Sequence, residues 1–244
     1  MESIAGRVAI ITGSSSGIGA AVARALAGEG VRVVVNSRSS VEVGEALAAE
    51  LPEATYVQGD IADEAQARRL VSAAIDRWGR LDILVNNAGT TVRIPHADLD
   101  AVTDEVWHRI LDVNVLGTWY LTRAAVPALR EHGDGVIVNI SSLAGVRPTG
   151  SSVPYAVSKA AVNHLTVLLA NVLGPQIRVN AVAPGLIETP WTEGWTDLHQ
   201  VVKGMAPLQR SGIPDEVAEV CLMLVRSGYV TGQIVVVDGG LGLR

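Results

Sequence analysis

The sequence predicts an α/β fold in which a doubly wound, seven-stranded parallel sheet lies between two layers of helices. Short runs rich in Val and Ile, such as VRVVVN at residues 31–36, are apolar at consecutive positions. Such runs are typical of parallel strands that are buried on both faces. Stretches of ten or more residues with helical spacing separate these runs, and the alternation indicates right-handed βαβ crossovers. With 244 residues and no internal repeat or linker, the chain suits a single domain covering residues 1–244.

The predicted elements alternate along most of the chain. We expect strands at residues 7–12, 31–36, 56–58, 81–86, 136–140, 177–182 and 233–237. We expect helices at residues 17–29, 41–51, 63–78, 104–111, about 117–130 and 152–173. Residues 184–207 are irregular and contain three prolines and three glycines. Because they follow the carboxyl end of a strand, where ligands bind in open α/β sheets, we interpret them as a lid-like substrate segment; a plain surface loop is the alternative.

Composition excludes several classes of function. Lys and Arg total 19 against 25 Asp and Glu, a formal net charge of −6, and no stretch is basic, so no nucleic-acid partner is expected. The single Cys221 cannot form an internal disulfide, and the five histidines lack metal-ligand spacing, so no metal site is expected. No apolar run approaches the roughly 18 residues of a membrane span, and the first residues do not read as an export signal. We therefore expect a cytoplasmic protein with no membrane partner.

A glycine-rich turn, TGSSSGIG at residues 12–19, joins the first strand to the first helix. A phosphate-binding turn needs backbone without side-chain obstruction and free N–H groups at a helix start. Gly13 can make the tight turn, Gly17 lets a pyrophosphate approach, and Gly19 lets the helix pack closely on the sheet. The spacing is G-x-x-x-G-x-G rather than G-x-G-x-x-G, but the strand before it and the helix after it support a dinucleotide site.

A candidate acid–base site combines Tyr155, Lys159 and Ser142. Tyr155 and Lys159 are four residues apart in a helical stretch, so both side chains lie on one face. An unperturbed tyrosine has a pKa of about 10, and a nearby ammonium group lowers that pKa toward neutrality, where proton transfer is faster. Ser142 follows a predicted strand, where a hydroxyl can hold a substrate oxygen, and strand alternation favours it over Ser141.

Several motifs, in this order, resemble the short-chain dehydrogenase/reductase family over nearly the whole chain. They are TGSSSGIG at 12–19, NNAG at 86–89, PG at 184–185 and VDGG at 237–240, with the tetrad Asn114, Ser142, Tyr155 and Lys159. The resemblance implies a Rossmann-like sheet and hydride transfer between a nicotinamide cofactor and a carbonyl or alcohol. It implies that Ser142 and Tyr155 bond the carbonyl oxygen, that Tyr155 donates the proton, and that Lys159 holds the nicotinamide ribose. For Asn114 it implies a bound water that links Lys159 to solvent; a local helix kink is the alternative.

The resemblance also implies how the cofactor is held. The second strand ends in NSRS at 36–39, with Ser37 where NAD-binding members carry an acid and Arg38 after it. A hydroxyl and a guanidinium suit a 2′-phosphate, so we favour NADP and keep NAD as the alternative. Against this, Ser16 stands where many NADP-binding relatives have a second basic residue, and Arg38 has the alternative of being a solvated loop residue.

Asp60 resembles the acid that bonds the adenine amino group, or else caps the helix that begins near residue 63. The expected cofactor contacts are Gly13, Ser15, Ser16, Gly17, Ile18, Gly19, Ser37, Arg38, Asp60, Ile61, Asn87, Ala88, Gly89, Tyr155, Lys159, Pro184, Gly185, Ile187 and Thr189.

The expected reaction is hydride transfer between NADP(H) and the carbonyl or secondary alcohol of a small molecule. A 3-oxoacyl-carrier-protein reductase is one alternative, but residues 133–135 and 174–176, which would face an acidic carrier, contain no Lys or Arg. A cofactor-binding regulator without turnover is a second alternative, and a nucleotide-sugar epimerase or dehydratase is a third.

In relatives the part corresponding to residues 230–244 supports subunit contacts, so a homotetramer or homodimer is expected. The candidate substrate contacts are Ile94, His96, Leu143, Leu186, Trp191 and Trp195; for both tryptophans, anchoring the irregular segment on the core is the alternative.

Overall fold

The structure is a computed structural model that describes residues 3–243, and it confirms the predicted sheet. Within residues 3–243, seven strands, all parallel, lie in the order β3-β2-β1-β4-β5-β6-β7. The strands are β1 (Val8–Ile11), β2 (Arg32–Ser37), β3 (Ala54–Gln58), β4 (Ile83–Asn86), β5 (Gly135–Ile140), β6 (Ile177–Pro184) and β7 (Ile234–Val237). The order reverses direction between β1 and β4, so the carboxyl ends of these two strands flank the crevice in which open α/β sheets bind ligands.

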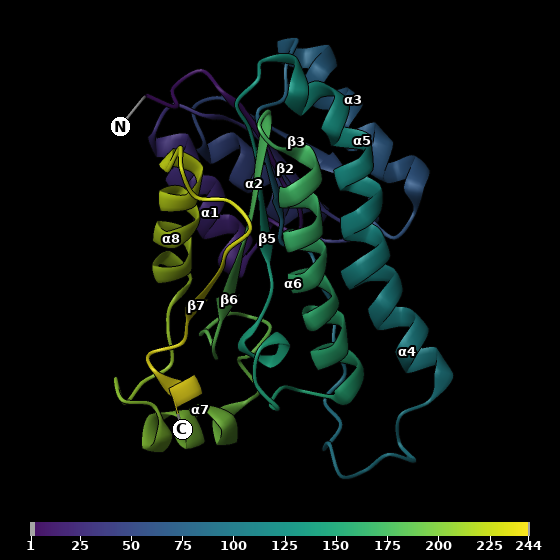
Figure 1. Cartoon of the computed structure of the whole chain (residues 1–244), viewed down its shortest axis with the longest axis vertical. Helices are drawn as coiled ribbons and strands as arrows, with labels where there is room; N and C mark the ends of the chain where they lie inside the picture. Colours follow the sequence, from purple (N-terminus) through teal and green to yellow (C-terminus); the bar gives the residue numbers. More distant parts are fainter. Residues whose placement is uncertain (1–2, 244) are drawn as a thin grey trace.

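Helices cover both faces of the sheet (Figure 1). On one face lie α1 (Gly17–Gly28), α2 (Val41–Glu50) and α8 (Pro214–Arg226). On the other lie α3 (Glu64–Trp78), α4 (Asp104–Leu111), α5 (Thr118–Glu131) and α6 (Val153–Leu173). The short helix α7 (Thr196–Met205) lies with the C-terminus at one end of the molecule (Figure 1). This is the end toward which the strands run, so the helix belongs to the ligand-binding edge of the sheet.

Two hydrophobic cores explain why the strands are apolar at every position. Along β2, Val33 and Val35 pack into the core under α1, α2 and α8, whereas Val34 packs into the core under α3, α5 and α6. All three side chains are fully buried. Successive side chains of a strand point to opposite faces, so a strand with a core on each side needs apolar residues throughout.

Three helical features differ from the sequence expectations. Helix α7 (Thr196–Met205) lies within residues 184–207, which were expected to be irregular. Helix α8 was not expected, although Pro214 and Glu216 in its first turn are start signals, and Glu216 accepts a hydrogen bond from the Ile213 N–H at 2.9 Å. The expected helices at 104–111 and 117–130 form one continuous rod. A six-residue π-helical stretch, Asp112–Gly117, joins them. Asn114 lies in that stretch, and such insertions often occur at functional sites.

Helix α6 has the length and hydropathy of a membrane-spanning segment. It contains 21 residues, its mean hydropathy reaches 1.3, and 44% of that apolar window is buried inside the protein. Leu169 and Leu173 of this helix pack into the core beneath the sheet, and Lys159 is buried on the same helix. Part of the apolar character of α6 therefore comes from its place as a core helix.

Candidate active site

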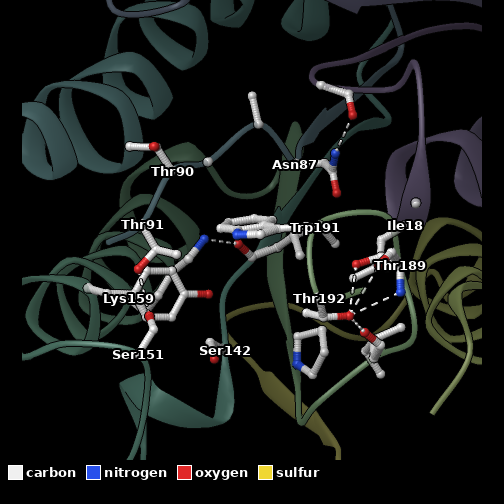
Figure 2. A pocket seen from close by; sticks show the side chains of 18 of the residues that line it. Ile18, Asn87, Thr90, Thr91, Ser142, Ser151, Lys159, Thr189, Trp191 and Thr192 are labelled. Carbon is white, nitrogen blue, oxygen red and sulfur yellow. Dashed lines mark hydrogen bonds between the residues drawn. The ribbon is translucent and has the colours of Figure 1, made fainter. Parts of the chain in front are cut away.

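A cavity of about 490 Å³ opens at the carboxyl ends of β1, β4, β5 and β6. Its walls come from the glycine turn, the loop that follows β4, the start of α6 and the segment 184–207 (Figure 2). Leu241, near the end of the chain, completes one side. Segments that are far apart in the sequence therefore meet here, as the parallel topology requires.

The glycine positions of the turn do not suit side chains. Gly13 has φ +59°, and a Cβ added to it would lie 2.9 Å from the Cα of Ala88. A Cβ on Gly19 would lie 2.5 Å from the Nδ2 of Asn87 and 2.7 Å from the carbonyl oxygen of Gly13. Gly17 has φ +55°, which residues with a side chain rarely adopt. The turn therefore presents bare backbone to the cavity at the start of α1, the arrangement that binds phosphate groups.

Hydrogen bonds fasten the glycine turn to the NNAG loop. The Oγ1 of Thr12 accepts hydrogen bonds from the N–H groups of Asn87 and Ala88, both at 3.0 Å. The Nδ2 of Asn87 donates to the carbonyl oxygens of Thr12 at 2.8 Å and Gly13 at 3.0 Å. Asn36 supports the same turn, because its Oδ1 accepts from the Gly13 N–H at 3.3 Å. Asn36 was not among the expected site residues, and its buried amide at the end of β2 gives the loop a fixed anchor.

Beyond the glycine turn, at the carboxyl ends of β2 and β3, the cavity is lined by Ser37, Arg38 and Asp60. Ser37 is 5% exposed, and its hydroxyl lies 2.8 Å from the hydroxyl of Tyr56. The Arg38 side chain is 63% exposed and lies 4.0 Å from the Asp60 carboxylate, a loose ion pair. Asp60 does not cap α3: Asp63 does so, accepting from the N–H groups at the second and third helical positions. Arg38 is therefore free to contact an anion at the rim.

Tyr155, Lys159 and Ser142 line the other end of the same cavity. Ser152 caps α6 and accepts a hydrogen bond from the Tyr155 N–H at 3.4 Å, which fixes the first turn that carries the tyrosine. The Nζ of Lys159 donates to the carbonyl oxygen of Ile140 at 2.8 Å. Ser141 donates its hydroxyl proton to the Lys159 carbonyl at 3.2 Å. Ser142 thus remains the serine of this pair that faces Tyr155.

Burial controls the protonation of both titratable groups. It raises the pKa of Tyr155, and a hydrogen bond with Ser142 opposes that rise only in part. It lowers the pKa of Lys159 to about 8. The predicted lowering of the Tyr155 pKa by Lys159 is therefore wrong in direction for this structure. Loss of hydration dominates, because the ammonium group is 5.7 Å from the phenol ring centroid and bonds a backbone carbonyl instead.

Asn114 is 1% exposed and does not line the cavity. Its Oδ1 accepts from the Thr90 N–H at 2.7 Å, and its Nδ2 donates to the Ser158 hydroxyl at 2.9 Å. The amide therefore ties the loop after β4 to helix α6, one residue before Lys159. The π-helical stretch that holds Asn114 aims this side chain between the two elements.

Trp191 from the segment 184–207 reaches into the cavity. Its ring lies edge-to-face with Tyr155, with centroids 6.4 Å apart and planes at 82°. A Cβ built on Gly89 would lie 3.8 Å from the indole Cη2 and 3.6 Å from the Nζ of Lys159. Figure 2 shows the indole in the middle of the cavity, between Lys159 and Ile18. Trp191 therefore lies between the catalytic candidates and the glycine turn.

Comparison with known proteins places these features in a family. A family model described as enoyl-(acyl carrier protein) reductase matches residues 13–242. A Streptomyces violaceoruber protein named as ketoacyl reductase 2 of the granaticin polyketide synthase is 58% identical over 239 residues, covering 97% of this chain and 96% of that protein. The 3-oxoacyl-(acyl-carrier-protein) reductase of Thermotoga maritima is 39% identical over 246 residues, with 97% and 98% covered. The crystal structure of a short-chain dehydrogenase/reductase from Burkholderia xenovorans has a TM-score of 0.92 and 38% identity, with both chains covered completely.

The chain belongs to the short-chain dehydrogenase/reductase family. It is thus an oxidoreductase of a family that uses NAD or NADP. The structure of levodione reductase, with a TM-score of 0.91 and 31% identity over 98% of each chain, shares the same fold.

The structure of this short-chain dehydrogenase/reductase brings most of the sequence candidates together. All the expected cofactor contacts except Ser15 and Gly19 line the cavity, as do Leu143, Leu186, Trp191 and Trp195. Gly19 faces the turn behind it. Ile94 and His96 lie outside the lining, because the loop after β4 turns away at Ile94, whose N–H bonds the Ser151 carbonyl at 2.8 Å.

Some lining residues carried no local sequence signal. Thr91, Ser151, Leu198, Val202 and Leu241 reach the cavity from loops, from α7 and from the chain end. Only the tertiary arrangement brings them there. Within residues 3–243, no group of three or more His, Cys, Asp and Glu side chains could hold a metal ion.

Proposed function

We propose that this enzyme reduces the carbonyl group of a small molecule with NADPH, or oxidises the matching secondary alcohol with NADP. The observation that carries the proposal is that Tyr155, Ser142 and Lys159 share one cavity with a bare glycine turn and Arg38. The first group suits acid–base work on an oxygen atom, and the second suits a phosphorylated dinucleotide.

The residues present fit the cofactor. Side chains at Gly13 and Gly19 would overlap neighbouring backbone atoms, so at these positions the turn can contact a cofactor only through its backbone. Arg38 at the rim is placed to bind a 2′-phosphate, and β2 carries no acid beside it that would repel one. When bound, the nicotinamide cofactor supplies or accepts the hydride. Because the indole of Trp191 lies between Gly89 and Tyr155, we propose that it moves aside and that the segment 184–207 acts as a lid.

The side chains of this protein supply position and protons. Ser142 and Tyr155 would bond the substrate carbonyl oxygen, and the raised pKa of Tyr155 keeps its phenol protonated at neutral pH, ready to donate. Lys159, with a pKa near 8, exchanges a proton close to working pH and would hold the nicotinamide ribose. Asn114 keeps the loop after β4 in register with α6 through its bonds to Thr90 and Ser158.

A ketoacyl group is the second candidate substrate. The relatives that support it are the granaticin ketoacyl reductase 2, at 58% identity, and the carrier-protein reductase of Thermotoga maritima, at 39%. Both candidates need the same carbonyl chemistry and differ only in what is attached to the ketone.

Cofactor binding followed by a carbonyl screen tests the proposal. NADPH should bind more tightly than NADH, and its absorbance should fall when a ketone from a panel of simple ketones and 3-oxo esters is added. Tight NADPH binding with no oxidation by any ketone would instead indicate a regulator without turnover.

We also propose that the enzyme is a homotetramer or homodimer in the cytoplasm. Apolar side chains are exposed on the outer faces of α5, α6 and the π-helical stretch: Leu116, Trp119, Val157, Val167, Leu168 and Val172. Near the chain end, Val236 and Leu243 are exposed as well. Exposed apolar patches of this kind mark contact surfaces, and light scattering on the purified protein would give the number of copies.

A further inference from the structure

Two hydroxyl groups in the cavity wall have no part in the mechanism above. Thr91 lies in the loop after β4, and Ser151 lies in the loop before α6. Their oxygens are 2.6 Å apart, and both residues line the cavity. Figure 2 shows Thr91, Ser151 and Ser142 on one side of the Trp191 indole, and Ile18 and Thr189 on the other. The hydroxyl pair therefore belongs to the substrate end of the cavity.

One of the two hydroxyl protons of the pair is available to a ligand. Each hydroxyl carries one proton and two acceptor lone pairs, and the bond between Thr91 and Ser151 uses one proton. For the remaining proton, the nearest bonded acceptor is the Val92 carbonyl oxygen, 3.4 Å from the Thr91 hydroxyl. Protein O–H···O bonds usually measure about 2.5–3.0 Å, so this one is weak. A ligand oxygen at normal distance would replace it.

The hydroxyls are not needed to hold the two loops together. A backbone bond from the Ile94 N–H to the Ser151 carbonyl oxygen, at 2.8 Å, already joins the loop after β4 to the loop before α6. The first turn of α6 is capped by Ser152 rather than by Ser151. The side-chain pair is therefore available for another purpose.

The position of the pair beside Tyr155 limits what it could bind. Gly150, the residue before Ser151, has φ +125°, and a Cβ on it would lie 3.7 Å from the Cδ1 of Tyr155. The loop thus runs along the phenol ring, with the reacting oxygen expected at the hydroxyl of the ring and the pair beside the ring. A substrate with a second oxygen close to its ketone, as in a 1,3-dicarbonyl compound, suits this arrangement.

We propose that Thr91 and Ser151 bind the second carbonyl oxygen of a 3-oxo ester or 3-oxo thioester while its ketone faces Tyr155 and Ser142. This inference rests on the proposed carbonyl reduction and narrows its substrate class. A simple ketone leaves the pair without a ligand oxygen, so the pair selects between the two kinds of substrate. A site that bonds a substrate oxygen discriminates against an analogue that lacks it.

The test compares ethyl 3-oxobutanoate with heptan-2-one, in which methylene groups replace the ester. Thr91→Val removes the hydroxyl and keeps the side-chain shape. We expect the ratio of kcat/KM for the ester to that for the ketone to fall by about three- to tenfold, mainly through a higher KM for the ester. A change of this size corresponds to the loss of one hydrogen bond. Thr91→Ser, which keeps the hydroxyl, should restore the ratio.

A second variant separates binding from structure. Thr91→Val combined with Ser151→Ala removes both hydroxyl protons and should lower the ratio at least as far as Thr91→Val alone. Equal losses for both substrates, or an unchanged ratio, would overturn this inference and leave the proposed function standing. Absence of NADPH oxidation by wild-type enzyme with either compound would overturn both.

Discussion

The two walls of the cavity are built in different ways. The glycine turn and the NNAG loop present backbone, and hydrogen bonds that Thr12 accepts from Asn87 and Ala88 hold them together. The facing segment 184–207 presents side chains, among them the indole of Trp191, which is 46% exposed. The wall formed by the glycine turn therefore depends on backbone atoms, which every residue has, whereas the facing wall depends on side chains that can change without disturbing the sheet.

Glycine substitutions in the two walls should show the largest difference. A Cβ at Gly19 overlaps the amide of Asn87 and the Gly13 carbonyl, whereas a Cβ at Gly194 meets nothing within 4 Å. We expect Gly19→Ala to lower the free energy of unfolding by about 3 kcal/mol and to weaken NADPH binding, since overpacking against backbone cannot relax. Gly194→Ala should change neither. Urea unfolding of both variants checks this, and equal stabilities would show that the walls do not differ.

Lys159 should make the stability of the fold depend on pH. Its pKa is about 8 in the folded protein and 10.5 in the unfolded chain, so between these values the unfolded chain holds more protons. The contribution of Lys159 to the free energy of unfolding therefore rises with pH across this window, by about 3 kcal/mol. The raised pKa of Cys221, about 12, acts in the opposite direction above pH 9, and the raised pKa of Tyr155 does so above pH 10. In Lys159→Met the rise between pH 8 and 10 should be absent; the same slope in both proteins would refute the assignment.

Arg38 should decide between the two nicotinamide cofactors. It is exposed at the rim and bonds only loosely to Asp60, so a phosphate can engage it fully. Hydrogen bonds to charged groups contribute about 1.5–3 kcal/mol, so Arg38→Ala should weaken NADPH binding by about 10- to 100-fold. NADH is the matched control, because it lacks the 2′-phosphate and should bind the variant as it binds wild type. Equal losses of affinity for both cofactors would show that Arg38 does not recognise the 2′-phosphate.

Trp191 should give the smallest effect, and in the opposite direction. The indole contacts Tyr155 and lies beside Gly89, where the nicotinamide end of the cofactor is expected. In wild type, NADPH has to displace the indole and break its aromatic contact with Tyr155. Trp191→Ala removes this cost, so the Kd for NADPH should fall by about two- to tenfold. Trp195→Ala is the control: Trp195 stacks on Arg93, with the guanidinium 6.0 Å from the ring centroid, and should leave Kd unchanged. Weaker NADPH binding by Trp191→Ala would show that the indole supports the cofactor.

The sheet and the glycine turn could be predicted because their signals are local. Runs such as residues 31–36 must be apolar when Val33 and Val34 face different cores, and Gly13 and Gly19 have no room for a side chain. Helix α8, although not predicted, also has local start signals in Pro214 and Glu216.

Other features of the site depend on the complete fold. The pKa of Tyr155 is set by burial, which four-residue spacing from Lys159 does not reveal. The pairing of Thr91 with Ser151 joins residues 60 positions apart, and no pattern in either loop indicates it. His96 shows the converse case, since its place near the NNAG motif suggested a substrate contact and the chain path takes it out of the cavity lining.

The central claim is that Tyr155 transfers the proton in a cavity that it shares with the cofactor turn, and Tyr155→Phe tests it directly. The measurement pairs NADPH affinity with the rate of ketone reduction in the same variant. We predict an NADPH Kd close to that of wild type and a kcat lower by at least about 100-fold, the usual contribution of a positioned general acid. Turnover of Tyr155→Phe at the wild-type rate would contradict the account.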